Sequence, residues 1–428
     1  MSRARRAVLQ MEYEHVDISE DIAGSVKSFS YEDIASGESD RISLCVQDRE
    51  RKWMGGWAPK KGDHVNASML FYDWQKEGNH WGTFCGSFEV DDVSMSGPPA
   101  ACTIGAVSIP RAEGFNEEER TKNWEDVTVR EIAVEIAGRA GIALSYEAED
   151  IHIKSLEQDK ETDCKFLYAV CEKYGLAMKV FAEKIVIFDE AVYEAVAPVV
   201  TLSYQDFIRY GYNSTMAGTY TGAKISYSDP GSNKKHIVTV GGGSRIKEMN
   251  VEADSAEDAR RKAVAKLNNE NKKAVTFSGT VISRPELIAS CCINITGFGV
   301  PDGTYYLDKV TSKIGGNASQ QSFEAHRVGY RMDNAIVHLK PQKKKTSGEI
   351  SGAYTVQKGD TLYKIAKDTL GSALRYAEIY DLNKEVIEAE AQGRGKKDSA
   401  NGHWLFAGTV LQLPGAEEES GEGDHGEQ

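Results

Sequence analysis

Short segments in which apolar and polar residues alternate fill the first part of the chain. Residues 41–48, 65–72 and 82–90 each follow a period of two, and turn-forming stretches such as 59–63 separate them. Alternation with this period places apolar side chains on one face of a strand, and several short strands divided by turns are typical of barrels and sandwiches. The pattern therefore predicts a β-rich domain over residues 1–112.

Helical spacing then replaces the alternation. Residues 127–137 repeat isoleucine and alanine every four positions, with Asp126 or Thr128 available as the N-cap, and residues 164–173 carry a second apolar face. Apolar residues at that spacing lie on one side of a helix. Two strands are expected to follow, at 176–181 and 184–189. Residues 113–198 are therefore predicted to form an α+β insert.

Strands return after the insert. We expect a second β-rich domain over residues 199–340, with a helix that begins at Asp254 or Ser255 and has Glu257 in place to complete a capping box. The expected strands lie at 223–227, 236–240, 275–283, 291–297, 304–314 and 321–328. The order of β-rich, α+β and β-rich segments predicts a multidomain protein that is mainly β.

Composition changes sharply toward the C-terminal end. Residues 341–352 are polar and rich in lysine, glycine and serine, which predicts a linker. A small domain is expected over residues 353–415. Residues 416–428 are rich in glutamate and glycine and lack apolar side chains for a core, so we expect a disordered acidic tail.

The charge balance excludes one class of partner. The chain has 65 acidic and 51 basic residues, for a net charge of -14. Gripping a phosphate backbone requires clustered lysine and arginine, and the basic residues here are scattered, so no specific nucleic-acid binding is expected. The sequence also lacks a signal peptide and an apolar run of about 20 residues, so we expect synthesis in a cytoplasm and no membrane association.

Motifs for catalysis and metal binding are absent from the sequence. It contains no HExxH, no clustered cysteine and histidine, no GxSxG and no Walker loop. Gly241, Gly242 and Gly243 follow a strand but lack GxGxxG spacing, so they are interpreted as a hairpin or turn. The seven cysteines form no CxxC pair and are predicted to be buried thiols. We therefore expect no enzymatic activity, no cofactor and no metal.

One local motif is specific. Residues 354–366 resemble the opening of a LysM domain, and residues 405–414 resemble its close. The resemblance implies a small βααβ domain. LysM domains bind polymers of N-acetylglucosamine through two loops, and the resemblance implies these candidate glycan-binding residues: Gly359, Asp360, Thr361, Leu362 and Asn383.

The segment between Asn383 and Leu405 departs from the common LysM form because it is long. We expect it to enlarge the second of the two loops. LysM domains of phage tail proteins resemble this form, and that resemblance implies protein docking in preference to glycan binding; both uses remain open.

The rest of the chain, up to about residue 340, resembles the phage late control protein D family, the baseplate hub proteins of contractile phage tails. The resemblance lies in the order of several segments: 5–7, 17–22, 28–33, 35–40, 47–49, 57–63 and 297–306. It implies two tube-like β-barrel domains in a homotrimer that adapts the hexameric tail tube to the trimeric central spike.

The same resemblance implies partners and a location. The partners would be the tail tube protein, the central spike protein, baseplate wedge proteins and tape-measure proteins. The location would be the baseplate of a virion or of a phage-tail-like particle, such as a bacteriocin or another contractile injection system, assembled in the bacterial cytoplasm. The alternative is a tail-associated protein that binds peptidoglycan through LysM or degrades the cell wall.

Overall fold

The computed structural model describes residues 5–74, 76–108, 114–181, 184–228, 235–315, 318–332, 350–357, 362–370, 376–394, 399 and 405–414. The chain divides into two compact units, Met1–Asn334 and Ala335–Gln428. Strands account for 48% of the structure and helices for 22%, so the prediction of a mainly β protein with several sheets is confirmed.

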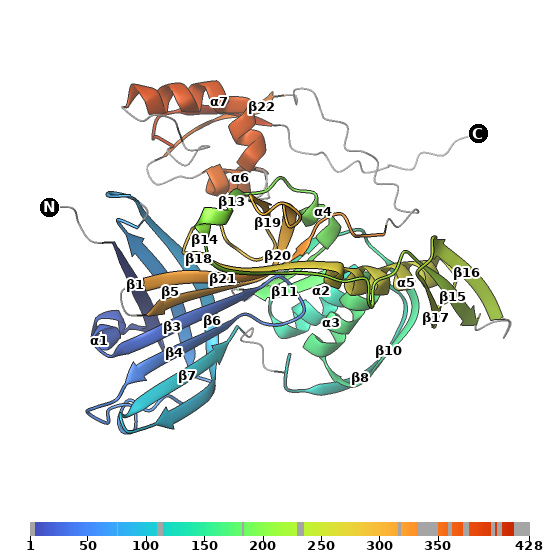
Figure 1. Ribbon diagram of the computed structural model, residues 1–428, viewed down its shortest axis with the longest axis horizontal. Coiled ribbons are helices and arrows are strands. Elements are labelled where there is room, and N and C mark those ends of the chain that lie inside the picture. Colours follow the sequence, from blue (N-terminus) through green and yellow to red (C-terminus); the bar gives the residue numbers. More distant parts are fainter. Residues whose placement is uncertain are drawn as a thin grey trace, which may run out of the picture. The chain divides into compact units, whose positions relative to one another are not determined.

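A 13-stranded sheet is the largest element of the first unit (Figure 1). In sheet order it contains β14 (Phe207–Ser214), β18 (Val275–Ile282), β21 (Ala318–Arg327), β20 (Gly303–Gly315), β3 (Val26–Ile34), β4 (Arg41–Gln47), β7 (Ala101–Val107), β6 (His80–Ser96), β5 (His64–Tyr72), β1 (Arg6–Tyr13) and β2 (Val16–Asp17), while β19 (Cys292–Thr296) pairs with β20 and β13 (Val200–Ser203) with β19. Strands from the two ends of the unit meet where β3 pairs with β20 in antiparallel register, from Lys309 opposite Ile34 to Gly315 opposite Ser28. The two predicted β-rich segments therefore share one continuous sheet.

Each half of this sheet covers its own apolar core. The half from the N-terminal strands buries Phe29, Phe71 and Phe88, and the half from the later strands buries Phe277 and Phe323. Burial alternates along the strands, as in β5, where every second side chain faces the core. The alternation that predicted strands thus also selects the buried face.

The insert folds as an α+β layer with a separate core. It contains β8 (Glu119–Thr128), α2 (Val129–Ala140), β9 (Ala143–Glu147), β10 (His152–Thr162), α3 (Asp163–Tyr174), β11 (Ala177–Phe181), β12 (Lys184–Phe188) and α4 (Glu190–Glu194). Of the two predicted caps, Thr128 is the N-cap of α2, and its side chain completes a capping box with Glu131. Gly141 and Gly175 end α2 and α3 in left-handed conformations, which glycine adopts without steric cost.

The strands predicted at 223–227 and 236–240 do not join the large sheet. They are β15 (Gly222–Ser228) and β16 (Lys235–Gly241), which form a separate three-stranded sheet with β17 (Ile246–Asn250). Helix α5 (Ala256–Asn271) packs on this sheet and shares its core. Both strands alternate, and alternation alone does not say which sheet receives a strand.

Two local predictions in this region can be compared with the structure. The glycine run joins β16 to β17, and β15 lies between these strands, so of the two predicted alternatives, hairpin or turn, the run is a turn. The N-cap of α5 is Ser255, whose side chain accepts from the backbone N–H of Asp258. Glu257 is therefore only the second helical residue, one position too early for the capping box that we predicted.

The second unit has a core of its own and a β-strand pair. Its elements are β22 (Ile350–Thr355), α6 (Leu362–Leu370), α7 (Tyr376–Gly393) and β23 (Val410–Pro414), and β22 pairs with β23 in antiparallel register. Strand β22 begins inside the predicted linker 341–352, whose earlier part lies outside the described residues. The predicted acidic tail, 416–428, also lies outside them.

Three short helical elements complete the first unit: α1 (Ser19–Ala23), η1 (Tyr204–Asp206) and η2 (Lys272–Ala274). All seven cysteines are free thiols, five of them buried and two half-buried. None of the helices in the described part of the chain is both long and apolar enough to cross a membrane.

Candidate functional site

Two clusters of buried charge join segments of the first unit that are far apart in sequence. The first, the junction cluster, consists of Lys179 on β11 and the carboxylates of Asp33 and Asp40. Lys179 donates to Asp33, and its Nζ lies 3.3 Å from Oδ2 of Asp40. Asp33 also accepts from the backbone N–H of Ala289 at 2.8 Å, and Asp40 from that of Ile34 at 2.9 Å. The cluster therefore ties both halves of the large sheet to the insert.

Burial sets the protonation of the junction cluster. Burial raises the pKa of Asp40 to about 6, against the opposing attraction of Lys179. Burial works to lower the pKa of Lys179, but the negative charges of Asp33 and Asp40 outweigh it and raise this pKa above its ordinary value. The ammonium of Lys179 is thus the single cation beside the two carboxylates of the junction cluster. The cluster therefore carries excess negative charge above pH 6.

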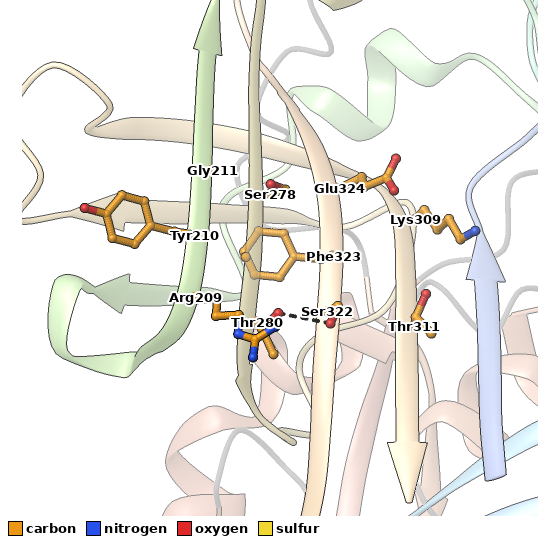
Figure 2. A pocket seen from close by; sticks show the side chains of 11 residues that line it. Arg209, Tyr210, Gly211, Ser278, Thr280, Lys309, Thr311, Ser322, Phe323 and Glu324 are labelled. Atoms are coloured by element: carbon orange, nitrogen blue, oxygen red, sulfur yellow. Dashed lines mark hydrogen bonds between the residues drawn. The ribbon is translucent and has the colours of Figure 1, made fainter. Parts of the chain in front are cut away.

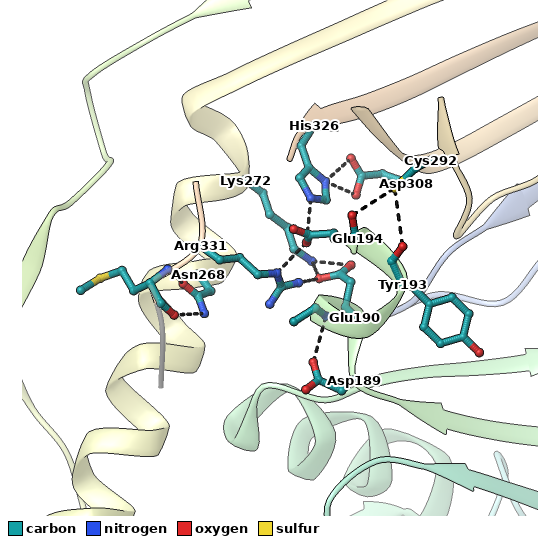
Figure 3. Close-up of polar contacts among 12 residues, drawn as sticks. Asp189, Glu190, Tyr193, Glu194, Asn268, Lys272, Cys292, Asp308, His326 and Arg331 are labelled. Carbon is teal, nitrogen blue, oxygen red and sulfur yellow. Dashed lines mark hydrogen bonds and ion pairs between the residues drawn. The ribbon is translucent and has the colours of Figure 1, made fainter. Parts of the chain in front are cut away.

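The second cluster, the α4 cluster, surrounds helix α4 (Figure 3). Its members are Glu190, Glu194, Lys272, Asp308, His326 and Arg331. The His326 ring bonds Glu194 at 3.1 Å and Asp308 at 2.8 Å, and Arg331 donates to Glu194 at 2.6 Å and also to Glu190. Three cations therefore face three carboxylates.

Hydrogen bonds within the α4 cluster shift the pKa values of His326 and Glu194. Burial alone would lower the pKa of His326, but its bonds to Asp308 and Glu194 raise the pKa to about 9. Burial likewise opposes ionisation of Glu194, but bonds from His326 and Arg331 lower its pKa below the ordinary value. His326 is therefore protonated near neutral pH and lacks the free lone pair of a general base. The cluster is built to hold α4 in place.

No group of three or more potential metal-ligating side chains occurs among the described residues. The contacts of both charge clusters are to protein groups that stabilise the fold. Sequence reasoning missed both clusters, because their members carry no local motif.

The second unit places two of the five predicted glycan-binding residues in its core. Leu362 on α6 is 2% exposed, and Asn383 on α7 is 4% exposed. The Asn383 amide donates to the carbonyls of Ile379 and Gln412, both at 2.7 Å, and its oxygen accepts from the N–H of Gln412 at 2.6 Å. Asn383 thus fastens α7 to β23. Gly359, Asp360 and Thr361 lie outside the described residues.

The expected enlargement of the loop after Asn383 takes a different form. Helix α7 continues through this position to Gly393, and two side chains of this extension, Ile387 and Ala391, are buried. Glu388 on the extension accepts from the hydroxyl of Tyr380 at 2.7 Å and from the N–H of Ser399 at 2.8 Å. Much of the added sequence therefore lengthens a helix, because apolar residues continue at helical spacing.

Comparisons with known proteins also distinguish a LysM domain from the rest of the chain. Residues 354–387 match the LysM domain family. The chain is 25% identical to a probable baseplate hub protein of Escherichia phage 186, over 61% of this chain and 67% of that protein. It is 26% identical to the probable baseplate hub protein of Escherichia phage P2, over 49% of this chain and 54% of that one.

A solved structure shares the fold. The tail protein from Neisseria meningitidis MC58 superposes with a TM-score of 0.59 at 12% identity, over 76% of this chain and 98% of that chain. The sequence-based resemblance is therefore confirmed: this chain is homologous to phage baseplate hub proteins and carries a LysM domain near its C-terminal end.

Proposed function

We propose that this protein is the baseplate hub of a contractile phage tail or phage-tail-like particle, where a homotrimer adapts the hexameric tail tube to the trimeric spike. The observation that carries the proposal is the β3–β20 pairing, which makes one sheet from two β-rich segments with separate cores. Two β modules fixed in one subunit allow a trimer to present six similar surfaces to a tube and three to a spike.

The charge clusters support this role because an adaptor must transmit force without deforming. The junction cluster fixes the insert to both halves of the sheet, and the α4 cluster fixes the end of the insert to β20 and β21. The two phage relatives are named as probable baseplate hub proteins, which supports an assembly role. Tube, spike, wedge and tape-measure proteins are the partners that this role requires.

The direct test is the composition of assembled particles. Particles purified from the producing bacterium would be analysed by quantitative mass spectrometry, with the hub counted against the spike protein. We expect equal numbers of hub and spike chains, because both would be trimers on one axis. Absence of the chain from intact particles would overturn the proposal.

We further propose that the LysM domain docks to baseplate proteins. The extension of α7, fixed by Glu388, adds helical surface to the domain, and two of the implied glycan-binding residues serve its core.

The competing function is a tail protein that binds or degrades peptidoglycan, which the LysM family match favours. Sedimentation of the full chain with purified peptidoglycan, beside a chain ending at Asn334, separates the two uses. We expect equal, weak sedimentation of both chains. Sedimentation that depends on the LysM domain would favour glycan binding, and clearing on a peptidoglycan zymogram would reveal a wall-degrading activity.

A further inference from the structure

Strand β14 leaves one edge of the 13-stranded sheet open. Among the described residues, β14 pairs only with β18. The register of this pairing is interrupted once, by a bulge between Phe207 and Arg209. Its eight residues, FIRYGYNS, include no proline, lysine or carboxylate. Natural proteins protect an edge strand with such residues, with bulges or by keeping it very short, because unpaired backbone groups attract another strand. The bulge in β14 lies before Arg209, and the strand is regular from there to Ser214, so this part of the edge can accept a neighbour.

The polar side of this edge carries a shallow pocket of about 270 Å³ (Figure 2). Arg209 and Gly211 line it from β14, and Ser278, Thr280 and Ser322 contribute hydroxyls from the next two strands. The Thr280 and Ser322 hydroxyls bond each other at 3.1 Å. A side chain at position 211 would meet Ser278 Oγ at 2.8 Å, so glycine keeps the pocket open at the edge.

Charge in the pocket is positive at the edge and mixed farther in. Arg209 is exposed, and no ion pair is described for its guanidinium. Lys309 also lines the pocket but pairs with Glu32 at 3.0 Å, and Glu324 lies on β21, two strands from the edge. The group nearest the open edge is therefore a cation that can pair with an incoming carboxylate.

The opposite side of β14 is apolar. Tyr210 is 52% exposed, and its ring lies 4.8 Å from that of Phe298 and 6.0 Å from that of Tyr204, which is also exposed. Because successive residues of a strand point to opposite faces, Arg209 and Tyr210 offer one polar and one apolar contact to the same neighbour.

We propose that β14 receives an extended strand from a partner protein, with acidic side chains over the Arg209 pocket and apolar side chains on the Tyr210 face. Backbone pairing with the open edge supplies affinity, and the two faces select a strand that alternates acidic and apolar residues. The site rests on the proposed hub function only for the identity of the partner, which would be another protein of the particle.

A peptide probe tests the recognition chemistry. An acetylated, fluorescently labelled peptide of alternating valine and glutamate, as long as β14, would be titrated with the full chain, beside a valine–lysine peptide. We expect the glutamate peptide to bind at least about tenfold more tightly, and Arg209→Glu to abolish this preference. Arg49→Glu is the matched control, because Arg49 is an exposed arginine between β4 and β5 that does not line the pocket.

Three outcomes would overturn the proposal: no binding of either peptide, equal binding of both, or equal loss in the two arginine variants. Light scattering of the free chain adds a further arm, since a dimer that Arg209→Glu dissociates would identify a second copy as the occupant instead. Equal melting temperatures would verify that both variants fold.

Hydrogen exchange on assembled particles separates this inference from the proposed function. We expect the amides of residues 207–214 to exchange more slowly in particles than in the free chain. If the chain is present in particles but these amides exchange at the free rate, the strand site is wrong and the hub role stands. If the chain is absent from particles, the hub role fails whatever the peptide shows.

Discussion

The junction cluster and the α4 cluster bury charge in the same unit but balance it differently. In the α4 cluster three cations meet three carboxylates, and Glu190 and Glu194 each have two cationic partners, so neither is left unpaired when Arg331 is removed. In the junction cluster Lys179 alone neutralises two buried carboxylates. The stability that a substitution costs should therefore depend less on the number of contacts in a cluster than on whether the substituted residue is the only partner of a buried charge.

The largest effect is expected for Lys179→Met. This substitution leaves Asp33 and Asp40 buried together without a cation, and breaking a buried pair in this way costs about 3–5 kcal/mol. Urea unfolding measures the change. Adding Asp40→Asn should recover part of the loss, and no recovery would show that the methionine itself disturbs the packing.

A smaller effect is expected for Arg331→Met in the α4 cluster. Glu190 keeps Lys272 at 2.7 Å and Glu194 keeps His326 at 3.1 Å, so the loss should be about 1–3 kcal/mol. The same urea experiment applies. A loss as large as that of Lys179→Met would break the distinction between the two clusters.

The pH dependence of the unfolding free energy should also distinguish the two clusters, because His326 titrates at higher pH than Asp40. The folded-state pKa of His326, about 9, lies above its ordinary value, so its contribution is complete below pH 6.5 and is lost as pH rises through 9. Unfolding free energy should therefore fall between pH 7 and 10. His326→Gln should flatten this slope, and an unchanged slope in the variant would contradict the assignment.

Asp40 should act at lower pH. Its folded-state pKa, about 6, also lies above the ordinary value, so the free energy of unfolding that it contributes is fully present below pH 4 and is lost as pH rises through 6. Comparing the wild type with Asp40→Asn from pH 4 to 7 isolates this term. The difference between the two proteins should change with pH in that window and level off above it.

The smallest effect is expected for Lys122→Met, which removes an ion pair between exposed side chains. Lys122 and Glu135 are 36% and 47% exposed, and solvent screens such pairs, so the change should be below about 1 kcal/mol. This variant calibrates the others, because it removes the same charge as Lys179→Met. A comparable loss in both would mean that burial is not the cause.

Local features of the fold were predictable from sequence. The cap at Thr128, the helix stop at Gly175 and the opening of the LysM domain each depend on residues within a few positions of one another. Residues 223–227 and 236–240 were correctly predicted as strands, but the separate sheet of β15 and β16 was not foreseen, because strand patterns do not specify a sheet. The two charge clusters could not be predicted from the sequence, because their members are far apart along the chain. Lys179 and Asp33 are 146 residues apart, and His326 and Glu194 are 132 residues apart.

The hub account is tested most directly by a cryo-EM map of particles that contain this chain. The account predicts threefold density for the large sheet on the tail axis, between the sixfold tube and the spike. Density for the chain elsewhere on the particle, or as a single copy off the axis, would contradict it.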